Sequence, residues 1–214
     1  SIIKSKNLID HNIKVIAGDN NKNIFSRYFV DKFWKMPTTN DKNFYLIIKN
    51  LIKLNIKVII PTRDGELSFW SSHKAKLNAK GINVLVNDFK KIIICNDKLK
   101  FHKFCKRNNI LVPIIFENNR ITNKKLIIKQ RYNSTINVIK NISQQKYLKK
   151  YQNYYDFPFV QEYISGKEIS VDVWTDKTKK KNFFISRYRD LVINGESQMT
   201  RGFENTKLNK IIKK

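Results

Sequence analysis

Four short segments of the sequence place charged side chains beside apolar runs, where they could contact a ligand. The first, residues 61–67, follows the apolar run 58–60 and carries Asp64 and Glu66. Ligands bind at the carboxyl ends of strands in open α/β sheets, so both carboxylates are candidate binding groups. An acidic first turn of the next helix explains the same two residues equally well, because negative charge is favourable there.

The second and third segments each contribute a lysine. Lys98 follows Asp97 at the start of an expected helix, and Lys129 lies near the end of the apolar run 126–130. A lysine beside such a run either reaches a ligand or extends its stem to place the ammonium group in water. The alternative for Lys98 is a surface helix that is capped by the residue before it.

The fourth segment, residues 159–173, joins an apolar strand, a tight turn at Gly166 and a second strand. In the second strand the apolar residues from Ile169 to Val173 occupy one face, and the polar residues between them occupy the other. The segment contains five candidate ligand-contacting positions: Gln161, Glu162, Tyr163, Ile164 and Glu168.

The elements that must position these residues alternate in the first part of the chain. Apolar periodicity and turn residues predict helices over residues 1–10, 41–54 and 66–79, and strands over residues 14–17, 58–60 and 82–86. Alternating strands and helices are typical of parallel strands joined by crossover helices. We therefore expect an α/β domain with a doubly wound parallel sheet over residues 1–90.

The pattern changes in the remainder of the chain, residues 91–214. The sequence predicts helices over residues 97–108 and 144–151, strands over residues 126–130 and 159–163, and a hairpin of residues 168–175 and 182–189. Strands joined by a tight turn pair antiparallel, so we expect an α+β domain here.

Composition excludes several classes of protein. A hydrophobic content of 41% over 214 residues favours folded domains over a disordered chain. No apolar run is long enough to cross a bilayer, and the longest, such as residues 92–95, are the size of a strand. The two cysteines do not form a disulfide framework, which favours a reducing, cytoplasmic location.

The formal net charge of +26 invites a nucleic-acid partner. However, Lys, Asn and Ile are over-used together along the whole chain, as A/T-rich coding produces, and the longest lysine run is residues 179–181. We therefore expect no specific nucleic-acid binding. The sequence also has no Walker A loop and no Gly-x-Gly-x-x-Gly motif, and its histidines and cysteines lack metal-ligand spacing.

In this order and on these elements, the four segments resemble the ATP-grasp superfamily, in particular the branch similar to the large subunit of carbamoyl-phosphate synthase. Residues 61–67 resemble the end of a central strand in that branch's pre-ATP-grasp domain, and residues 94–98 resemble the opening of its ATP-grasp domain. Residues 127–130 resemble the strand whose lysine contacts ATP phosphates, and residues 161–168 resemble the hinge against which adenine lies.

The resemblance implies an ATP- and Mg²⁺-dependent ligase that activates a small-molecule carboxylate as an acyl phosphate for an amine or similar nucleophile. ATP would lie between two antiparallel sheets, with the phosphates near Lys98 and Lys129 and the ribose near Glu168. Residues 161–164 would face the adenine, and Asp64 and Glu66 would bind substrate. Arg187 and Arg189 resemble arginines that face the nucleotide or substrate, which makes them the candidate catalytic residues. The alternative interpretation of these two arginines is that they face solvent from an edge strand. A homodimer is also possible for the whole protein.

Two features depart from the family. Its magnesium ligands, a Glu and a Glu/Asn pair followed by Pro-Arg, have no counterpart after Lys181, so we expect them beyond Lys214 and the ATP-grasp domain to be incomplete at its C-terminus. The glycine-rich loop expected after the phosphate-binding lysine is also absent, since no glycine lies between Gly81 and Gly166. Either the loop is shortened, or a mobile loop between Arg131 and Thr135 is missing from this sequence, which we favour and which predicts a break in the chain there.

These departures keep two alternatives to an active ligase open. One is a non-catalytic nucleotide-binding relative, and the other is a basic nucleic-acid-binding module.

Overall fold

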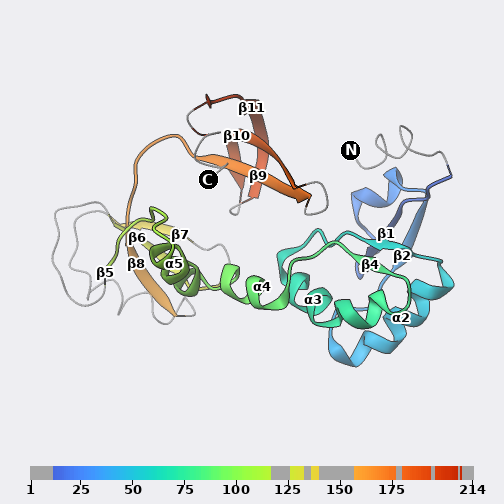
Figure 1. Cartoon of the computed structure of the whole chain (residues 1–214). Coiled ribbons are helices and arrows are strands. Elements are labelled where there is room, and N and C mark those ends of the chain that lie inside the picture. Colours follow the sequence, from blue (N-terminus) through green and yellow to red (C-terminus); the bar gives the residue numbers. More distant parts are fainter. Residues whose placement is uncertain are drawn as a thin grey trace. The chain divides into compact units, whose positions relative to one another are not determined.

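The computed structural model describes residues 12–116, 126–132, 136–139, 157–176, 180–193, 196–206 and 208, with the backbone alone at residues 136–139 and 196. The chain divides into two compact units, Ser1–Cys95 and Asn96–Lys214. Figure 1 shows the elements of both. The predicted helices over residues 1–10 and 144–151 lie outside the described residues.

The first unit contains two pairs of parallel strands. β1 (Ile16–Asp19) pairs with β2 (Lys32–Lys35), and β3 (Val58–Ile59) pairs with β4 (Asn83–Val84). The helical segments are η1 (Phe25–Phe29), η2 (Asp41–Asn43), α2 (Phe44–Lys53), α3 (Asp64–Asn78) and α4 (Phe89–Cys95). Because α3 is the crossover between β3 and β4, the expected α/β architecture with parallel strands is confirmed.

The core of this unit follows the predicted apolar periodicity. α2 buries Phe44, Ile47 and Leu51, which recur at helical spacing along one face. They pack in one cluster with Leu77 of α3 and Val84 of β4. The core therefore holds α3 against the strands whose carboxyl ends precede the candidate binding residues.

In the described part of the second unit, a helix precedes two antiparallel sheets, and the antiparallel pairing is as expected. The helix is α5 (Lys98–Arg107). The four-stranded sheet has the order β5-β8-β6-β7, and the three-stranded sheet has the order β11-β10-β9. Their strands are β5 (Ile115–Phe116), β6 (Leu126–Gln130), β7 (Ile136–Ile139), β8 (Pro158–Glu162), β9 (Ile169–Asp176), β10 (Lys181–Ile193) and β11 (Glu196–Phe203).

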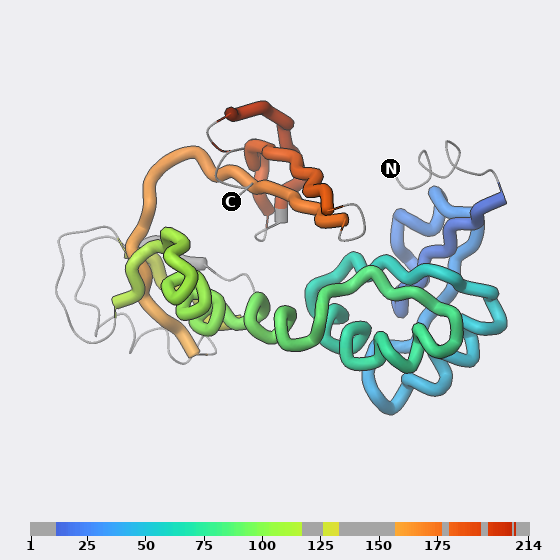
Figure 2. Tube along the Cα trace, viewed as in Figure 1, coloured from blue at the N-terminus to red at the C-terminus, as the bar shows by residue number. Residues whose placement is uncertain are grey.

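The connection from β8 into β9 links the two sheets and can be followed in Figure 2 as a continuous orange tube. It carries residues 163–168, which the sequence predicts to form the hinge and the tight turn. Gly166 has φ +147°, a conformation that is accessible to glycine and strained for other residues. The turn that separates the hinge from Glu168 therefore depends on this glycine.

Two elements add to what the sequence pattern indicates. The apolar run 92–95, which is the size of a strand, lies in helix α4, because short apolar runs do not distinguish strands from helices. β10 extends to Ile193 and pairs with β9 on one side and β11 on the other. Arg187 and Arg189 consequently lie on a central strand, and the edge-strand alternative for them is excluded.

β6 and β7 pair antiparallel, with Lys129 opposite Ile136. Residues 133–135 lie outside the described residues, and the predicted chain break there stays a prediction. Among the helices that the structure describes, none is long and apolar enough to cross a membrane.

Candidate functional site

The start of α5 is built around Asp97. This residue has extended backbone geometry as the N-cap, and its Oδ1 accepts hydrogen bonds from the backbone N–H groups of Leu99 and Lys100, both at 3.1 Å. An aspartate in this position satisfies donors that the first turn of a helix leaves open. The alternative of an N-capped surface helix is confirmed, since most of α5 is exposed, although Asp97 itself is only 2% exposed.

A bidentate ion pair joins Asp97 to Arg131, the residue that follows β6. Arg131 donates from Nε to Oδ1 at 3.0 Å and from Nη2 to Oδ2 at 2.6 Å. The Tyr132 hydroxyl donates to Oδ2 at 3.4 Å, and the Lys98 backbone N–H donates to the Arg131 carbonyl at 3.2 Å. Hydrogen bonding from Arg131 is the main reason that the pKa of Asp97 falls from 3.8 to about 2. The helix start and the strand end are thus held together.

Lys98 and Lys129 influence each other electrostatically. Burial lowers the pKa of Lys98, the charge of Lys129 lowers it further, and Asp97 acts in the opposite direction. Burial also lowers the pKa of Lys129, which lies mid-sheet on β6 between Ile136 of β7 and Phe159 of β8. Two partly desolvated ammonium groups that repel each other favour an anion that both can contact.

Glu168 completes the cluster from the other sheet. Its carboxylate raises the pKa of Lys129 and so opposes the effect of burial. It also accepts a hydrogen bond from Nη1 of Arg189, whose Nε donates to Ser197 Oγ at 2.7 Å. The structure therefore brings four sequence-predicted residues into one charged network: Lys98, Lys129, Glu168 and Arg189.

Arg187 is held by a separate carboxylate. It donates from Nε to Asp172 Oδ2 at 2.7 Å and from Nη2 to Oδ1 at 3.2 Å. This hydrogen bonding raises the already high pKa of Arg187. The strand register places both arginines and both acidic partners on the same face of the three-stranded sheet, opposite the apolar positions Ile169 and Val171.

The predicted hinge residues divide into two kinds. Gln161 is 8% exposed and pairs with Ile115 of β5 and with Ile127 of β6, so it lies inside the sheet. Glu162 is the last residue of β8, and its N–H donates to the Ile114 carbonyl at 2.8 Å. Tyr163 and Ile164 follow the last paired residue. They are therefore better placed than the strand residues to offer backbone groups to a ligand.

Asp64 and Glu66 form the acidic first turn of α3, as their alternative interpretation predicts. Glu66 accepts from Trp70 Nε1 at 3.3 Å and lies 3.8 Å from Arg63 Nη1. Glu66 also lines a hollow of about 250 Å³, whereas Asp64 does not. The other lining residues follow β1, β2 and β3: Asn20, Met36, Pro37, Thr38, Thr39, Arg63 and Gly65. This hollow therefore lies at the carboxyl ends of parallel strands.

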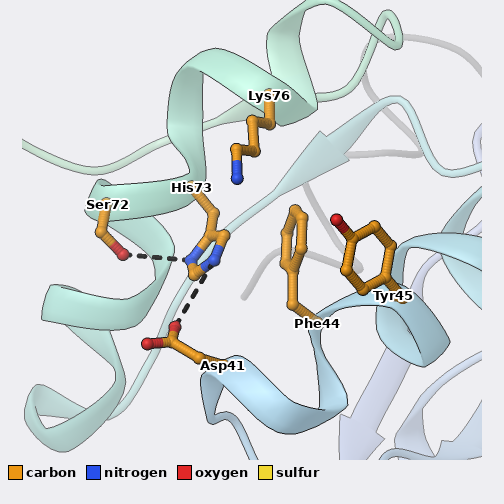
Figure 3. Close-up of a pocket in the computed structure, with 6 residues that line it drawn as sticks. All are labelled: Asp41, Phe44, Tyr45, Ser72, His73 and Lys76. Atoms are coloured by element: carbon orange, nitrogen blue, oxygen red, sulfur yellow. Dashed lines mark hydrogen bonds and ion pairs between the residues drawn. The ribbon is translucent and has the colours of Figure 1, made fainter.

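Another hollow, of about 350 Å³, contains none of the predicted residues (Figure 3). In it His73 lies 3.0 Å from Ser72 Oγ and 3.5 Å from Asp41 Oδ1, which superficially suggests a nucleophile and its base. However, the Ser72 hydroxyl donates to the Phe69 carbonyl at 2.9 Å within its own helix, and His73 Nδ1 lies 3.0 Å from the same carbonyl. These contacts satisfy helix groups and do not activate a serine.

The residues that the structure describes contain no group of three or more His, Cys, Asp or Glu side chains able to hold a metal ion. Sequence reasoning missed Arg131 and Tyr132, which organise the start of α5. The available signal was the pair of cations at alternate positions of one strand end, Lys129 and Arg131, together with the acidic helix start.

The pKa of Asp97 predicts a dependence of stability on pH. Because the carboxyl has a lower pKa in the folded chain than its ordinary value of 3.8, its contribution is complete above that value and is lost as pH falls towards about 2. The loss should be on the order of 2 kcal/mol. Urea unfolding of the protein and of Asp97→Asn should show the gap in unfolding free energy shrinking by this amount between about pH 5 and pH 2. A gap that does not vary with pH would contradict the assignment.

Two family models match the chain. The model for the PylC-like N-terminal domain matches residues 2–85, and the model for the ATP-grasp domain matches residues 95–209. No curated protein sequence matches the chain at a significant level.

Solved structures match most of the chain at low identity. The biotin carboxylase domain of 2-oxoglutarate carboxylase from Hydrogenobacter thermophilus, in complex with ADP, magnesium and bicarbonate, has 17% identity and a TM-score of 0.62, over 92% of this chain and 49% of that one. Biotin carboxylase from Campylobacter jejuni has 14% identity and a TM-score of 0.64, over 91% and 49%. N5-carboxyaminoimidazole ribonucleotide synthetase from Thermotoga maritima has 17% identity and a TM-score of 0.57, over 94% of this chain and 52% of that one. The chain thus spans about half the length of these structures and shares their fold.

Proposed function

Because the chain belongs to the ATP-grasp family, we propose that it binds ATP with Mg²⁺ and activates a carboxylate as an acyl phosphate for attack by an amine or similar nucleophile. The observation that carries this proposal is the network of Lys98, Lys129 and Glu168 between the start of α5, β6 and the start of β9. Its two desolvated cations suit a polyphosphate, and its carboxylate suits sugar hydroxyls.

The residues fit the nucleotide in both charge and position. Phosphate oxygens would offset the mutual repulsion of Lys98 and Lys129 and would stabilise the charged state that burial disfavours. Glu168 would accept from the ribose hydroxyls, with Arg189 holding its carboxylate. Tyr163 and Ile164 would offer backbone groups to the adenine edge beyond the end of β8.

Bound ATP and Mg²⁺ supply the phosphoryl group and the neutralising charge for transfer to the carboxylate. The chain's own contribution is positioning. Arg187 and Arg189, each oriented by a carboxylate on the same sheet face, would point their remaining donors toward the reacting oxygens. Planar guanidinium groups suit this role because they present several donors in a fixed fork.

We place the nucleotide site in residues 91–214 and substrate selection in residues 1–90. The hollow beside Glu66 and Arg63, at the carboxyl ends of β1, β2 and β3, is the substrate-binding region that we favour. Asp64 would contribute from the same helix turn. We place the enzyme in the cytoplasm, where Cys95 and Cys105 stay reduced, and leave a homodimer as an option, since a matching biotin carboxylase domain is described as a dimer.

Isothermal titration of ATP with Mg²⁺ into the protein tests the proposal. We expect ATP to bind more tightly than adenosine, because only ATP has phosphates that can contact both lysines. In a melting experiment, ATP at about 100 times its Kd should stabilise the fold by about 2.7 kcal/mol. Absence of both binding and stabilisation would overturn the proposed function.

The role of Glu168 makes a separate prediction. Glu168→Gln should weaken ATP binding, because hydrogen bonds to a charged group contribute about 1.5–3 kcal/mol, roughly tenfold or more in affinity. The variant and the wild type should bind 2′,3′-dideoxy-ATP almost alike, since that analogue lacks both hydroxyl groups. If the variant loses the same factor for ATP and for the dideoxy analogue, Glu168 acts on Lys129 or Arg189 and not on the ribose.

A non-catalytic nucleotide-binding protein is the second candidate. The connection after Lys129 contains no glycine to let backbone N–H groups approach phosphates, and no metal cluster is present in the described part of the chain. This candidate predicts ATP binding without release of ADP in the presence of any carboxylate. Carboxylate-dependent ADP release would exclude it.

A further inference from the structure

We propose that Arg131 is a positioning residue for the phosphate site, and that its ion pair with Asp97 holds Lys98 and Lys129 together for the nucleotide. This inference rests on the proposed function. Arg131 would touch no substrate atom itself. It would act through the two backbone segments that carry the lysines.

The connections from the ion pair to both lysines are short. Lys98 is the residue after Asp97, and its backbone N–H donates to the Arg131 carbonyl at 3.2 Å. Lys129 lies in β6, two residues before Arg131, which directly follows the strand. Fixing Asp97 against Arg131 therefore fixes the origin of both lysine side chains.

The two lysines need such a restraint because they repel each other. The charge of Lys129 lowers the pKa of Lys98, and burial of each ammonium group adds to the cost of keeping both charged. Without a link, the α5 start and the β6 end could separate and relieve this repulsion, and the preformed site for phosphates would be lost. A restraint that exists before the ligand arrives reduces the conformational entropy that is lost on binding.

The geometry of the link is specific to arginine. Two nitrogens of one guanidinium group contact the two oxygens of one carboxylate, at 3.0 and 2.6 Å. The same Oδ1 already accepts from Leu99 and Lys100, so Asp97 fixes the helix start and the strand end with one side chain. A lysine at position 131 would keep the charge but could not make both contacts.

The test compares Arg131→Met, Arg131→Lys and the control Arg201→Met by titration with ATP and with adenosine. Arg201 also pairs with a carboxylate, Asp190 at 3.4 Å, but that pair is at the surface. We expect Arg131→Met to bind ATP about tenfold or more weakly and adenosine about as well as the wild type, and Arg131→Lys to recover only part of the loss. Arg201→Met should bind both ligands like the wild type.

A merely structural role would give a different result, and a double-variant comparison separates the two. In a Lys98→Ala/Lys129→Ala background, adding Arg131→Met should cause little further loss of ATP affinity, because no lysines remain to be positioned. A further loss of the same size in this background, or equal losses of affinity for ATP and adenosine, would overturn the inference. The proposed function would still stand in that case, provided that the wild type binds ATP. If the wild type bound no ATP, both would be overturned. Thermal unfolding of each variant shows whether it is folded, and Arg131→Lys carries the test if Arg131→Met is not.

Discussion

Lys129→Ala is expected to weaken ATP binding by about 1.5–3 kcal/mol, roughly tenfold to more than a hundredfold in Kd. The ammonium group lies in mid-sheet, partly desolvated, where a charge-assisted contact to phosphate is screened less than at the surface. Removing the ammonium group also removes its repulsion with Lys98. The measured loss of binding free energy is therefore the contribution of the phosphate contact minus the energy of that repulsion. Isothermal titration with ATP and Mg²⁺ measures it.

The matched control is Lys103→Ala, which removes an exposed lysine from the same helix that begins at Lys98. It should leave the Kd unchanged, because an exposed charge contributes little at physiological salt. Adenosine binding should be the same in all three proteins. Equal ATP affinity in wild type and Lys129→Ala would remove Lys129 from the phosphate site.

Asp97→Ala is expected to lower the free energy of unfolding by about 3–5 kcal/mol. The substitution leaves the Arg131 guanidinium without its carboxylate and removes the acceptor for the N–H groups of Leu99 and Lys100. Asp97 is almost completely buried, and the Arg131 side chain that loses its partner is partly buried. Urea unfolding at neutral pH, followed by far-ultraviolet circular dichroism, measures the change.

Two further variants separate the cost of losing the helix cap from the cost of leaving Arg131 unpaired. Asp97→Asn keeps an oxygen for the helix cap and loses the charge, so its cost should be smaller than that of the alanine variant. Asp97→Ala combined with Arg131→Met removes both charges and should recover part of the loss, because an unpaired, partly buried charge costs more than none. A cost for Asp97→Ala below about 1 kcal/mol would mean that the ion pair is solvated and contributes like a surface pair.

Local periodicity determined much of the fold and placed several of the candidate site residues on their elements. α2 follows from the helical spacing of Phe44, Ile47 and Leu51, and β9 follows from clean alternation, since each pattern depends only on neighbouring residues and on the backbone repeat. Lys98, Lys129 and Glu168 could be chosen from the sequence because each stands at the edge of such an element. Their roles towards ATP are still predictions.

The tertiary structure decided which of these residues meet. The ion pair between Asp97 and Arg131 joins positions 34 residues apart, and it exists only because α5 begins beside the end of β6. Likewise, the central place of β10, which sets what Arg187 can contact, depends on β11 pairing along its far side. No local pattern specifies either, because strand order and the docking of a helix follow from how the whole set of apolar faces is buried.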